Sequence, residues 1–251
     1  RLVYSRNVNK VKKLVRNYHT GIDNQVINFT ETSAGGGFIR EGDSMGDVYI
    51  TKVLKRDAAG NIAVGADGSL SSMDLPNGQR LKIGNTNPDF TLGWRNNISW
   101  KGLNLSFLIN ARVGGIVTSA TQAVLDQFGV SKATADARDR GYVEVADGQR
   151  VDPQKYYEVV ANQQLMGYYY YSATNVRLQN ISLSYTLPKT LLGQGWPGVT
   201  VGLIANNLWM IYNKAPFDPE VAASTGTYGQ GSDYFSAPSL RNIGFSLKLN
   251  F

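Results

Sequence analysis

Cysteine is absent from the 251 residues, and histidine occurs once, as His19. Without cysteine the chain can form neither a disulfide framework nor a cysteine-ligated metal site, and it is compatible with a protein that crosses an oxidising compartment unfolded. His19 has no partner pattern around it, and the aspartates Asp43, Asp47, Asp57 and Asp67 lack the consecutive spacing of a calcium-ligating loop. The sequence therefore predicts no catalytic constellation, no cofactor and no metal site, and we do not expect an enzyme.

Long apolar runs are also absent. No stretch approaches the roughly 18 to 20 consecutive apolar residues that a membrane-spanning helix needs, so a helical membrane protein is excluded. A membrane β-strand is compatible with the sequence, because it needs only about ten residues, half of them apolar. The formal net charge is +6, but the basic residues are scattered apart from the cluster Lys10, Lys12, Lys13 and Arg16. A nucleic-acid partner is not expected, because a phosphate-tracking surface concentrates its charge on one face.

The last segment, Leu240 to Phe251, alternates between apolar and polar residues with the period of two that a β-strand requires. Its odd positions are Ile243, Phe245, Leu247, Leu249 and Phe251, and the residues between them are polar or small. One face of this strand would therefore meet lipid or a core, and the other would meet water.

The same alternation predicts four further strands, at Leu92 to Trp100, Leu103 to Val113, Val176 to Leu187 and Val199 to Tyr212. In the third of these the apolar phase moves from even to odd positions, which predicts a β-bulge near Gln179 and Asn180. In the fourth, Trp209 and Ile211 keep the outward parity of Val199.

The connections between these strands fall into two length classes. Trp100 to Leu103 is a tight hairpin, and Pro188 to Gly198 is a short turn rich in proline and glycine. Gly114 to about Ser172 and Asn213 to Ser239 are long, polar and aromatic. An outer-membrane barrel has short periplasmic turns on one rim and long extracellular loops on the other, and so requires this alternation. We therefore predict an all-β fold: an antiparallel transmembrane β-barrel with long extracellular loops.

Some local structure is expected inside the long connections. Gly35 to Asn87 would form another long extracellular loop. Short strands and helices are also expected before and within the long loops. These are an irregular strand within Leu2 to Leu14, short strands at Val48 to Leu54 and Ile62 to Val64, and short helices at Thr118 to Phe128 and Lys132 to Arg140.

Several runs of residues resemble one protein family. They are Ile83 to Trp94, with the Trp100-Lys101-Gly102 turn and Gly114-Gly115 after it, Asn175 to Tyr185, Asn206 to Trp209, and Phe217-Asp218-Pro219-Glu220 followed by the terminal strand. The runs occur in the family's order and cover roughly residues 40 to 251. In them the chain resembles the C-terminal part of SusC/RagA-family TonB-dependent outer-membrane transporters.

The resemblance implies that residues 1 to 251 are the C-terminal portion of the β-barrel domain. They would supply roughly five or six strands of a plugged barrel of about 22 strands, with the plug and N-terminal strands absent from this chain. The intact transporter would lie in the outer membrane of a Bacteroidota-like cell and import glycans or peptides. Its implied partners are TonB, through the missing N-terminal region, a SusD-like surface lipoprotein over the loops, the outer-membrane assembly machinery and membrane lipid.

Candidate functional residues follow from the same reading. Ile243, Phe245, Leu247 and Leu249 would face the membrane, and Phe251 resembles the terminal signal that the assembly machinery recognises. Tyr168, Tyr169 and Tyr170 lie where an extracellular loop enters a strand, and they could stack on sugar rings, contact a partner or pack at the rim. Arg112 and Arg177 fall on or near lumen-facing positions and could meet an anionic substrate or line a wet interior. Aromatic residues near strand ends suit a membrane interface, namely Trp94, Trp100, Trp196, Trp209 and Tyr212.

Two alternatives stay open. A passive porin would use the same strands without a plug or a lid, and the sequence upstream of this chain would distinguish it. A soluble β-sandwich that binds carbohydrate through long loops would bury Phe245, Leu247 and Leu249 between two sheets and would be monomeric in water without detergent.

Overall fold

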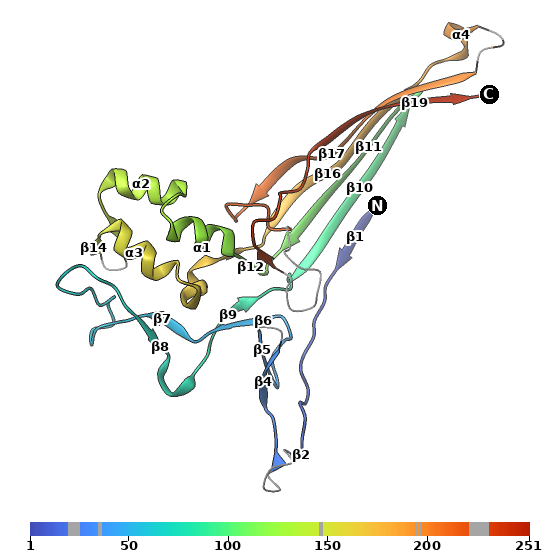
Figure 1. The fold of residues 1–251 in the computed structure, drawn as a ribbon. Helices are drawn as coiled ribbons and strands as arrows, with labels where there is room; N and C mark the ends of the chain where they lie inside the picture. The colour runs from blue at the N-terminus through green and yellow to red at the C-terminus, as the bar shows by residue number, and fades with distance from the viewer. Residues whose placement is uncertain (20–25, 35–36, 146–147, 194, 196, 221–230) are drawn as a thin grey trace.

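The computed structural model describes residues 1–19, 26–34, 37–145, 148–193, 195, 197–220 and 231–251. Figure 1 shows a long, twisted sheet whose strands run side by side, and a second group of small helices and short strands beyond one end of that sheet. We call these two parts the long sheet and the loop unit. None of the helices in the described part of the chain is long and apolar enough to cross a membrane.

The long sheet contains six strands in which every neighbouring pair is antiparallel. In spatial order they are β1 (Leu2–Ser5), β10 (Phe90–Trp100), β11 (Leu103–Val113), β16 (Asn175–Thr186), β17 (Gly198–Asn213) and β19 (Asn242–Asn250). The five strands that the alternation predicts are confirmed, and the irregular candidate near the start of the chain is a strand only at β1. β1 and β19 form the two edges, so the described residues make an open sheet and do not close into a barrel.

The register places most of the apolar residues of the six strands on one face. Residues that pair across antiparallel strands share a face, so each row of partners has one character. One row consists of Leu2, Trp94, Ile109, Leu178 and Trp209, and another consists of Ile98, Leu105, Leu183, Leu203 and Phe245. We call this side the apolar face.

The apolar face is not covered by a second layer. Ile243, Phe245 and Leu247 are 71%, 69% and 58% exposed, and Trp100 and Trp209 are also exposed. A β-sandwich would bury such side chains between two sheets, and the described structure does not have that arrangement. Trp196 lies outside the described residues.

Two irregularities bend the middle strands. Leu108 pairs with Asn180 and Ile109 pairs with Leu178, so Gln179 is the extra residue of a bulge, at the predicted place. In β17 the register shifts twice, and Tyr212 pairs with Val176. The expectation that Ile211 keeps the outward parity is therefore wrong, because a bulge adds one residue and Tyr212 takes the outward place.

The two short connections lie at the same end of the long sheet, away from the loop unit (Figure 1). In the hairpin between β10 and β11, Lys101 and Gly102 both have positive φ, at 44° and 86°. Two such residues form the type of tight turn that matches the twist of paired strands. The connection between β16 and β17 contains a single helical turn, α4 (Lys189–Leu192).

The loop unit is built from the connections at the other end. The segment before β10 supplies β6 (Asp47–Ile50), β7 (Lys52–Leu54), β8 (Ser72–Asp74), η1 (Pro76–Gly78) and β9 (Leu81–Asn85). The segment after β11 supplies β12 (Ile116–Ser119), α1 (Ala120–Gln127), α2 (Lys132–Arg140), β13 (Val143–Glu144), β14 (Arg150–Val151), α3 (Pro153–Val160), η3 (Gln163–Tyr169) and β15 (Tyr170–Ser172). From the last long connection, β18 (Ser232–Asp233) pairs with β12 in parallel.

Helix starts in the loop unit follow local capping chemistry. The side chains of Ser119, Ser131 and Asp152 accept hydrogen bonds from the backbone N–H groups of the first turns of α1, α2 and α3. Gly141 ends α2 in the left-handed conformation. Both helices predicted from the sequence are thus confirmed. The short strand expected at Ile62 to Val64 is wrong, because only an isolated bridge joins Arg56 to Ile62.

Between β1 and the loop unit, the chain forms an arm of small antiparallel pairs that projects away from the long sheet (Figure 1). Its strands are β2 (Tyr18–His19), β3 (Val26–Ile27), β4 (Glu31–Ala34) and β5 (Gly37–Arg40). Arg16 pairs with Glu41 and Arg80 pairs with Glu31, so ion pairs tie the arm to itself and to the loop unit.

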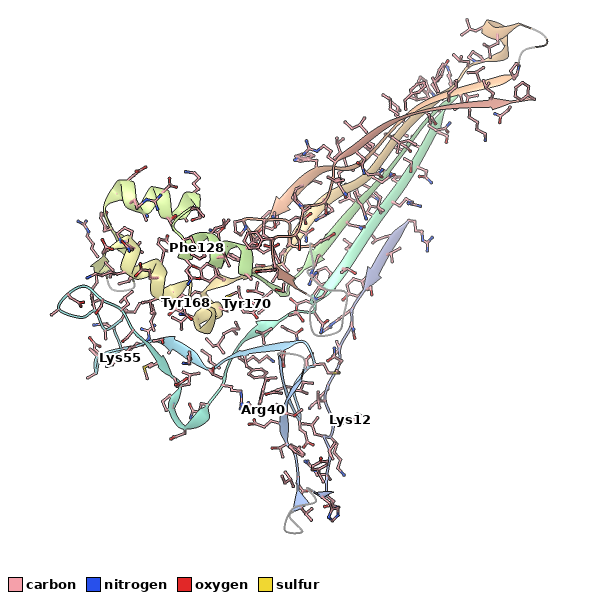
Figure 2. The ribbon with its side chains drawn as sticks, in the orientation of Figure 1. Lys12, Arg40, Lys55, Phe128, Tyr168 and Tyr170 are labelled. Carbon is pink, nitrogen blue, oxygen red and sulfur yellow. The ribbon has the colours of Figure 1, made fainter. Side chains whose placement is uncertain are left out.

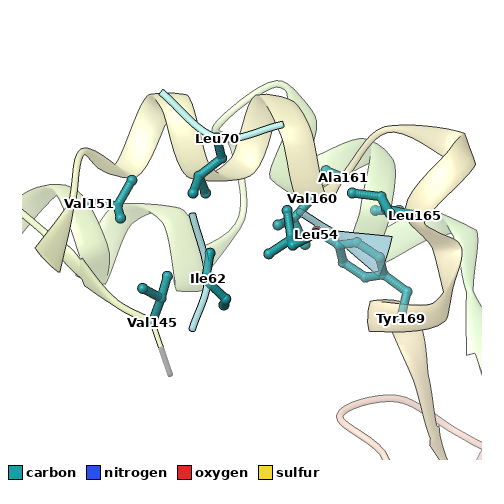
Figure 3. Packing of buried hydrophobic residues seen from close by; sticks show 10 residues of the cluster. Leu54, Ile62, Leu70, Val145, Val151, Val160, Ala161, Leu165 and Tyr169 are labelled. Atoms are coloured by element: carbon teal, nitrogen blue, oxygen red, sulfur yellow. The ribbon is translucent and has the colours of Figure 1, made fainter. Parts of the chain in front are cut away.

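The hydrophobic core lies in the loop unit. Leu54, Ile62 and Leu70 come from the segment before β10, and they pack against Val160 and Leu165 from the segment after β11 (Figure 3). Of the buried hydrophobic residues among those described, only Ala205 belongs to the long sheet. Two long connections that are distant in sequence therefore fold as one body.

Candidate functional site

The polar face of the long sheet, opposite the apolar face, carries small and polar residues near the short connections. A typical row there contains Ser99, Asn104, Ser184, Gly202 and Ser246. Near the loop unit the face changes character, because two rows each contain an arginine. These rows are Gly93, Asn110, Arg177 and Met210, and Thr91, Arg112, Asn175 and Asn213. Both sequence-predicted arginines thus lie on the polar face, at its loop end.

Arg177 is buried, at 4% exposure, and its guanidinium holds the last long connection. Its Nη2 lies 2.6 Å from Oδ1 of Asp218, and its Nη1 lies 3.5 Å from Oε2 of Glu220. Burial raises the pKa of the Asp218 carboxyl, but hydrogen bonds from Ser239, from the backbone of Glu220 and from Arg177 outweigh it, so the pKa is lowered overall. A carboxylate held in this way stays ionised and tethers the connection to the polar face.

Arg112 contacts a different connection. Its Nη2 donates a hydrogen bond of 2.7 Å to the carbonyl oxygen of Thr86, directly before β10. Its buried Nε has no hydrogen-bond partner among the described residues. The Nε of Arg177 is likewise without a partner there, and both nitrogens are enclosed by protein atoms.

A recess of about 470 Å³ opens beside Arg112 on the polar face. Its charged lining consists of Arg1, Arg95, Arg112 and Glu220, and its remaining lining is Val3, Pro88, Thr91, Leu92, Gly93, Leu108, Asn110 and Ala111. Three arginines face one glutamate here, and that glutamate is shared with Arg177. The lining of the recess therefore carries an excess of positive charge.

The three tyrosines predicted to contact a ligand are separated from this recess, because none of them lines it. They sit in the loop unit, where Figure 2 shows Tyr168 and Tyr170 close together. Tyr168 is 41% exposed, whereas Tyr169 is 3% exposed and belongs to the core. The Tyr169 hydroxyl donates a hydrogen bond of 3.0 Å to Oδ2 of Asp126, and burial together with this carboxylate raises the tyrosine pKa. Tyr170 is half-buried in β15.

The remaining predicted residues lie at one edge of the long sheet. Ile243, Phe245, Leu247 and Leu249 project from the apolar face of β19, and Phe251 follows the end of that strand with its side chain fully exposed. In the described ranges no three or more histidine, aspartate or glutamate side chains gather as a metal would require. Asp47, for example, accepts hydrogen bonds from Lys82 and Asn85.

Sequence reasoning missed Arg95 and the partners of Arg177. Arg95 has the opposite parity to Leu92, Trp94 and Ile98, so the alternation that predicted β10 also places it on the polar face. The pairing of Arg177 with Asp218 spans 41 positions and needs the fold of the last long connection, which periodicity does not encode.

No protein-family model matches the chain. Among curated proteins, TonB-dependent receptor P3 of Formosa agariphila is 26% identical over an alignment of 269 residues, which covers 99% of this chain and 26% of the receptor. TonB-dependent receptor P39 of the same organism is 28% identical over 213 residues, covering 81% of this chain and 20% of that receptor.

Solved structures share the fold of this chain. The structure of the RagAB peptide transporter superimposes with a TM-score of 0.55 at 18% identity, over 89% of this chain and 25% of that chain. The RagAB peptide importer in the open-open state gives a TM-score of 0.57 at 18% identity, over 89% and 24% of the two chains. The chain therefore corresponds to part of a TonB-dependent receptor, and it spans about a quarter of the length of the RagA-like transporter chains whose fold it shares.

Proposed function

We propose that this chain forms part of the barrel wall and extracellular loops of a TonB-dependent transporter in the outer membrane, which imports peptides or glycans. The observation that carries the proposal is the uncovered apolar face, continuous over six strands and backed by a polar face. In lipid every backbone polar group must be paired within the protein, and an antiparallel sheet that continues into a closed barrel meets this requirement. The apolar face then meets lipid, and the polar face lines the lumen.

The placement of the connections supports the same orientation. Both short connections lie at one end of the long sheet, and the loop unit lies at the other (Figure 1). We assign the short end to the periplasm and the loop unit to the cell exterior. Residues 1 to 251 would be the C-terminal portion of the barrel domain, with the plug and the TonB contact supplied by other parts of the receptor.

A surface lipoprotein of the RagB or SusD kind is the proposed partner, because the solved relatives are RagAB assemblies. The loop unit would be the part that it covers. Tyr168, with its exposed ring, is better placed than Tyr169 or Tyr170 to contact such a partner or a substrate. Phe251 is proposed as the terminal signal read by the assembly machinery. The TonB-dependent relatives favour energised import over a passive porin.

The orientation of β19 tests the proposal. Residues 1 to 251 contain no cysteine, so Leu247→Cys and Lys248→Cys each add one thiol to them, on opposite faces of the same strand. Any cysteine elsewhere in the receptor is replaced first. A nitroxide attached to each, in the whole receptor in outer-membrane vesicles, reports whether its surroundings are hydrocarbon or water. We expect the label at position 247 to be relaxed by oxygen and shielded from a water-soluble nickel complex, and the label at position 248 to show the reverse.

Equal access of the nickel complex to both positions would contradict a membrane-facing side. A receptor that fractionates with water-soluble proteins would contradict the proposed location as well. Ser246→Cys provides a second position on the polar face, so that a local effect of the lysine substitution can be recognised.

A further inference from the structure

The arginines that line the basic recess on the polar face are not all taken up by contacts that hold the fold together. Arg177 uses its guanidinium to hold Asp218 and Glu220, whereas Arg95 is exposed and both Arg95 and Arg112 line the recess. We propose that the recess lined by Arg95 and Arg112 binds the carboxylate of a peptide substrate as it passes along the lumen wall. This inference rests on the proposed function and names the substrate class that the wall selects.

The charge of the recess points to an anion. Arg1, Arg95 and Arg112 contribute three positive charges, and Glu220 contributes one negative charge that Arg177 already shares. An excess of positive charge in a partly enclosed recess raises the local concentration of anions, because field lines are focused where solvent is displaced. A neutral substrate would gain nothing from this arrangement.

The geometry of guanidinium groups narrows the anion to a planar one. The guanidinium presents donors in a rigid fork that matches the two oxygens of a carboxylate. Arg112 is held in place by its bond to the Thr86 carbonyl, so it is ordered before a ligand arrives. Arg95 pairs with Leu108, and the row of Gly93 and Asn110 separates it from the row of Arg112. Both arginines line the recess, so a ligand in it would lie between the two guanidinium groups.

The rest of the lining favours a peptide over an acidic sugar. Val3 and Leu108 place two apolar side chains beside the arginines of the recess, where a residue next to the carboxylate could pack. None of the lining residues is aromatic, whereas sugar rings are usually held by stacking on aromatic side chains. A volume of about 470 Å³ fits the end of a peptide chain and not a long segment of it.

The recess lies where a substrate would pass from the loop unit into the lumen. It lies at the loop end of the polar face, next to Pro88 and Glu220, which belong to two connections that enter the loop unit. A substrate released from the extracellular side would therefore meet it on entering the lumen. The carboxylate could come from the C-terminus of the peptide or from an acidic side chain, because both present the same group to the arginines.

The test uses the whole receptor in outer-membrane vesicles and a short glycine–serine peptide with a free terminal carboxylate. Binding is compared with that of the same peptide carrying a terminal amide, the same amidated peptide with one glutamate, and trigalacturonate. The variants are Arg95→Gln, Arg112→Gln and Arg112→Lys. Lys248→Gln is the matched control, because it removes one positive charge from the same face outside the recess.

We expect Arg95→Gln and Arg112→Gln each to weaken binding of the carboxylate peptide about ten-fold, the usual effect of losing one charged hydrogen bond. Arg112→Lys should restore part of this loss, since it keeps the charge but not the fork. Binding of the amidated peptide should not change in any variant. The glutamate peptide distinguishes recognition of a side-chain carboxylate from recognition of a terminal one. The proposal is supported if the wild-type receptor binds either carboxylate peptide more tightly than the amidated peptide.

Three results would overturn it. The first is that the wild-type receptor binds the amidated peptide as tightly as both carboxylate peptides, and the second is that it binds trigalacturonate more tightly than every peptide. The third is unchanged binding of the carboxylate peptides in both glutamine variants. Because Arg112→Gln could impair assembly, the abundance of folded receptor is measured in parallel, and the exposed Arg95 carries the test if Arg112 variants do not assemble.

Failure of this inference can be told apart from failure of the proposed function. A receptor that resides in the outer membrane and imports peptides without regard to their charge would contradict only the proposed carboxylate binding at the recess. A receptor that is not in the outer membrane, or that imports neither peptide nor sugar, would contradict both the carboxylate site and the proposed function.

Discussion

At the scale of single residues, Tyr169 links the core of the loop unit to a buried carboxylate. Removing its hydroxyl in Tyr169→Phe leaves Asp126 with one hydrogen-bond partner fewer, in a site that water does not reach freely. We expect the loop unit to lose about 1.5 to 3 kcal/mol, the usual value of a hydrogen bond to a charged group. Amide hydrogen exchange in α1 and η3 measures this loss. Tyr168→Phe is the control, since Tyr168 is 41% exposed and amide exchange in this variant should match the wild type.

Arg177 is the second residue whose removal should have a large local effect. Arg177→Gln leaves Asp218 buried without its cation, and breaking one side of a buried ion pair costs about 3 to 5 kcal/mol. We expect the segment after β17 to detach from the polar face and become cleavable by protease. Arg241→Gln removes an exposed arginine near the same segment and should leave the cleavage pattern unchanged. Equal resistance in Arg177→Gln would show that the ion pair does not hold this connection.

The same contact should depend on pH in one direction. The pKa of Asp218 is lower in the folded chain than its ordinary value, so the ion pair contributes its full stabilisation above the ordinary aspartate pKa of about 3.9 and loses it as the pH falls through the folded value. A nitroxide at Lys214→Cys would report this as a narrowing of its spectrum in acid. Asp218→Asn mimics the protonated state and should give the narrow spectrum already at neutral pH. A broad spectrum in that variant at neutral pH would contradict the assignment.

At the scale of elements, the hairpin between β10 and β11 depends on Gly102. Its φ is +86°, and a Cβ added there would lie 2.8 Å from the carbonyl oxygen of Thr186. Gly102→Ala therefore carries both a dihedral cost of about 1 to 2 kcal/mol and a steric clash with β16. We expect less folded receptor, measured as the fraction that keeps its compact mobility in unheated gel samples. Gly60→Ala separates the two costs, because Gly60 has a φ of +90° and open space around it.

Strands were predictable wherever one face is uniform over many residues. The bounds of β11 agree with the alternation from Leu103 to Val113, and the phase change located the bulge at Gln179. The outward place of Tyr212 was missed because a second register shift in β17 leaves no trace in residue polarity. Periodicity reveals a bulge where polar and apolar residues change phase, and it cannot do so at Met210, Ile211 and Tyr212, because none of these side chains is strongly polar.

The loop unit was predictable only in its helices, which begin at local caps such as Ser119 and Ser131. Its core joins Leu54 and Ile62 to Val160 and Leu165, about a hundred positions away, and no short-range pattern specifies such contacts. The candidate site divides in the same way. Parity placed Arg112 and Arg177 on the polar face, but their partners come from connections whose paths depend on this long-range packing.

At the scale of the whole molecule, the two parts obtain stability from different surroundings. The loop unit has a buried core of its own, whereas the long sheet contributes only Ala205 to the buried hydrophobic residues described. Burying one large apolar side chain gives about 1.5 to 3 kcal/mol, and this gain is missing in water for residues such as Phe245 and Leu247. The long sheet therefore requires an apolar solvent on one face, and the loop unit does not.

This difference predicts how the 251-residue chain behaves outside a membrane. In water without detergent the apolar face should drive association, and in detergent micelles it should be covered. Sedimentation should then find large particles in water and a smaller, uniform species in detergent. Replacing Phe245 and Leu247 together by glutamine should reduce the detergent bound, whereas the same change at Ser246 and Lys248 should not, because those side chains lie on the polar face. A uniform monomer in water would contradict this prediction, because the chain itself would then have to cover the side chains that the structure leaves exposed.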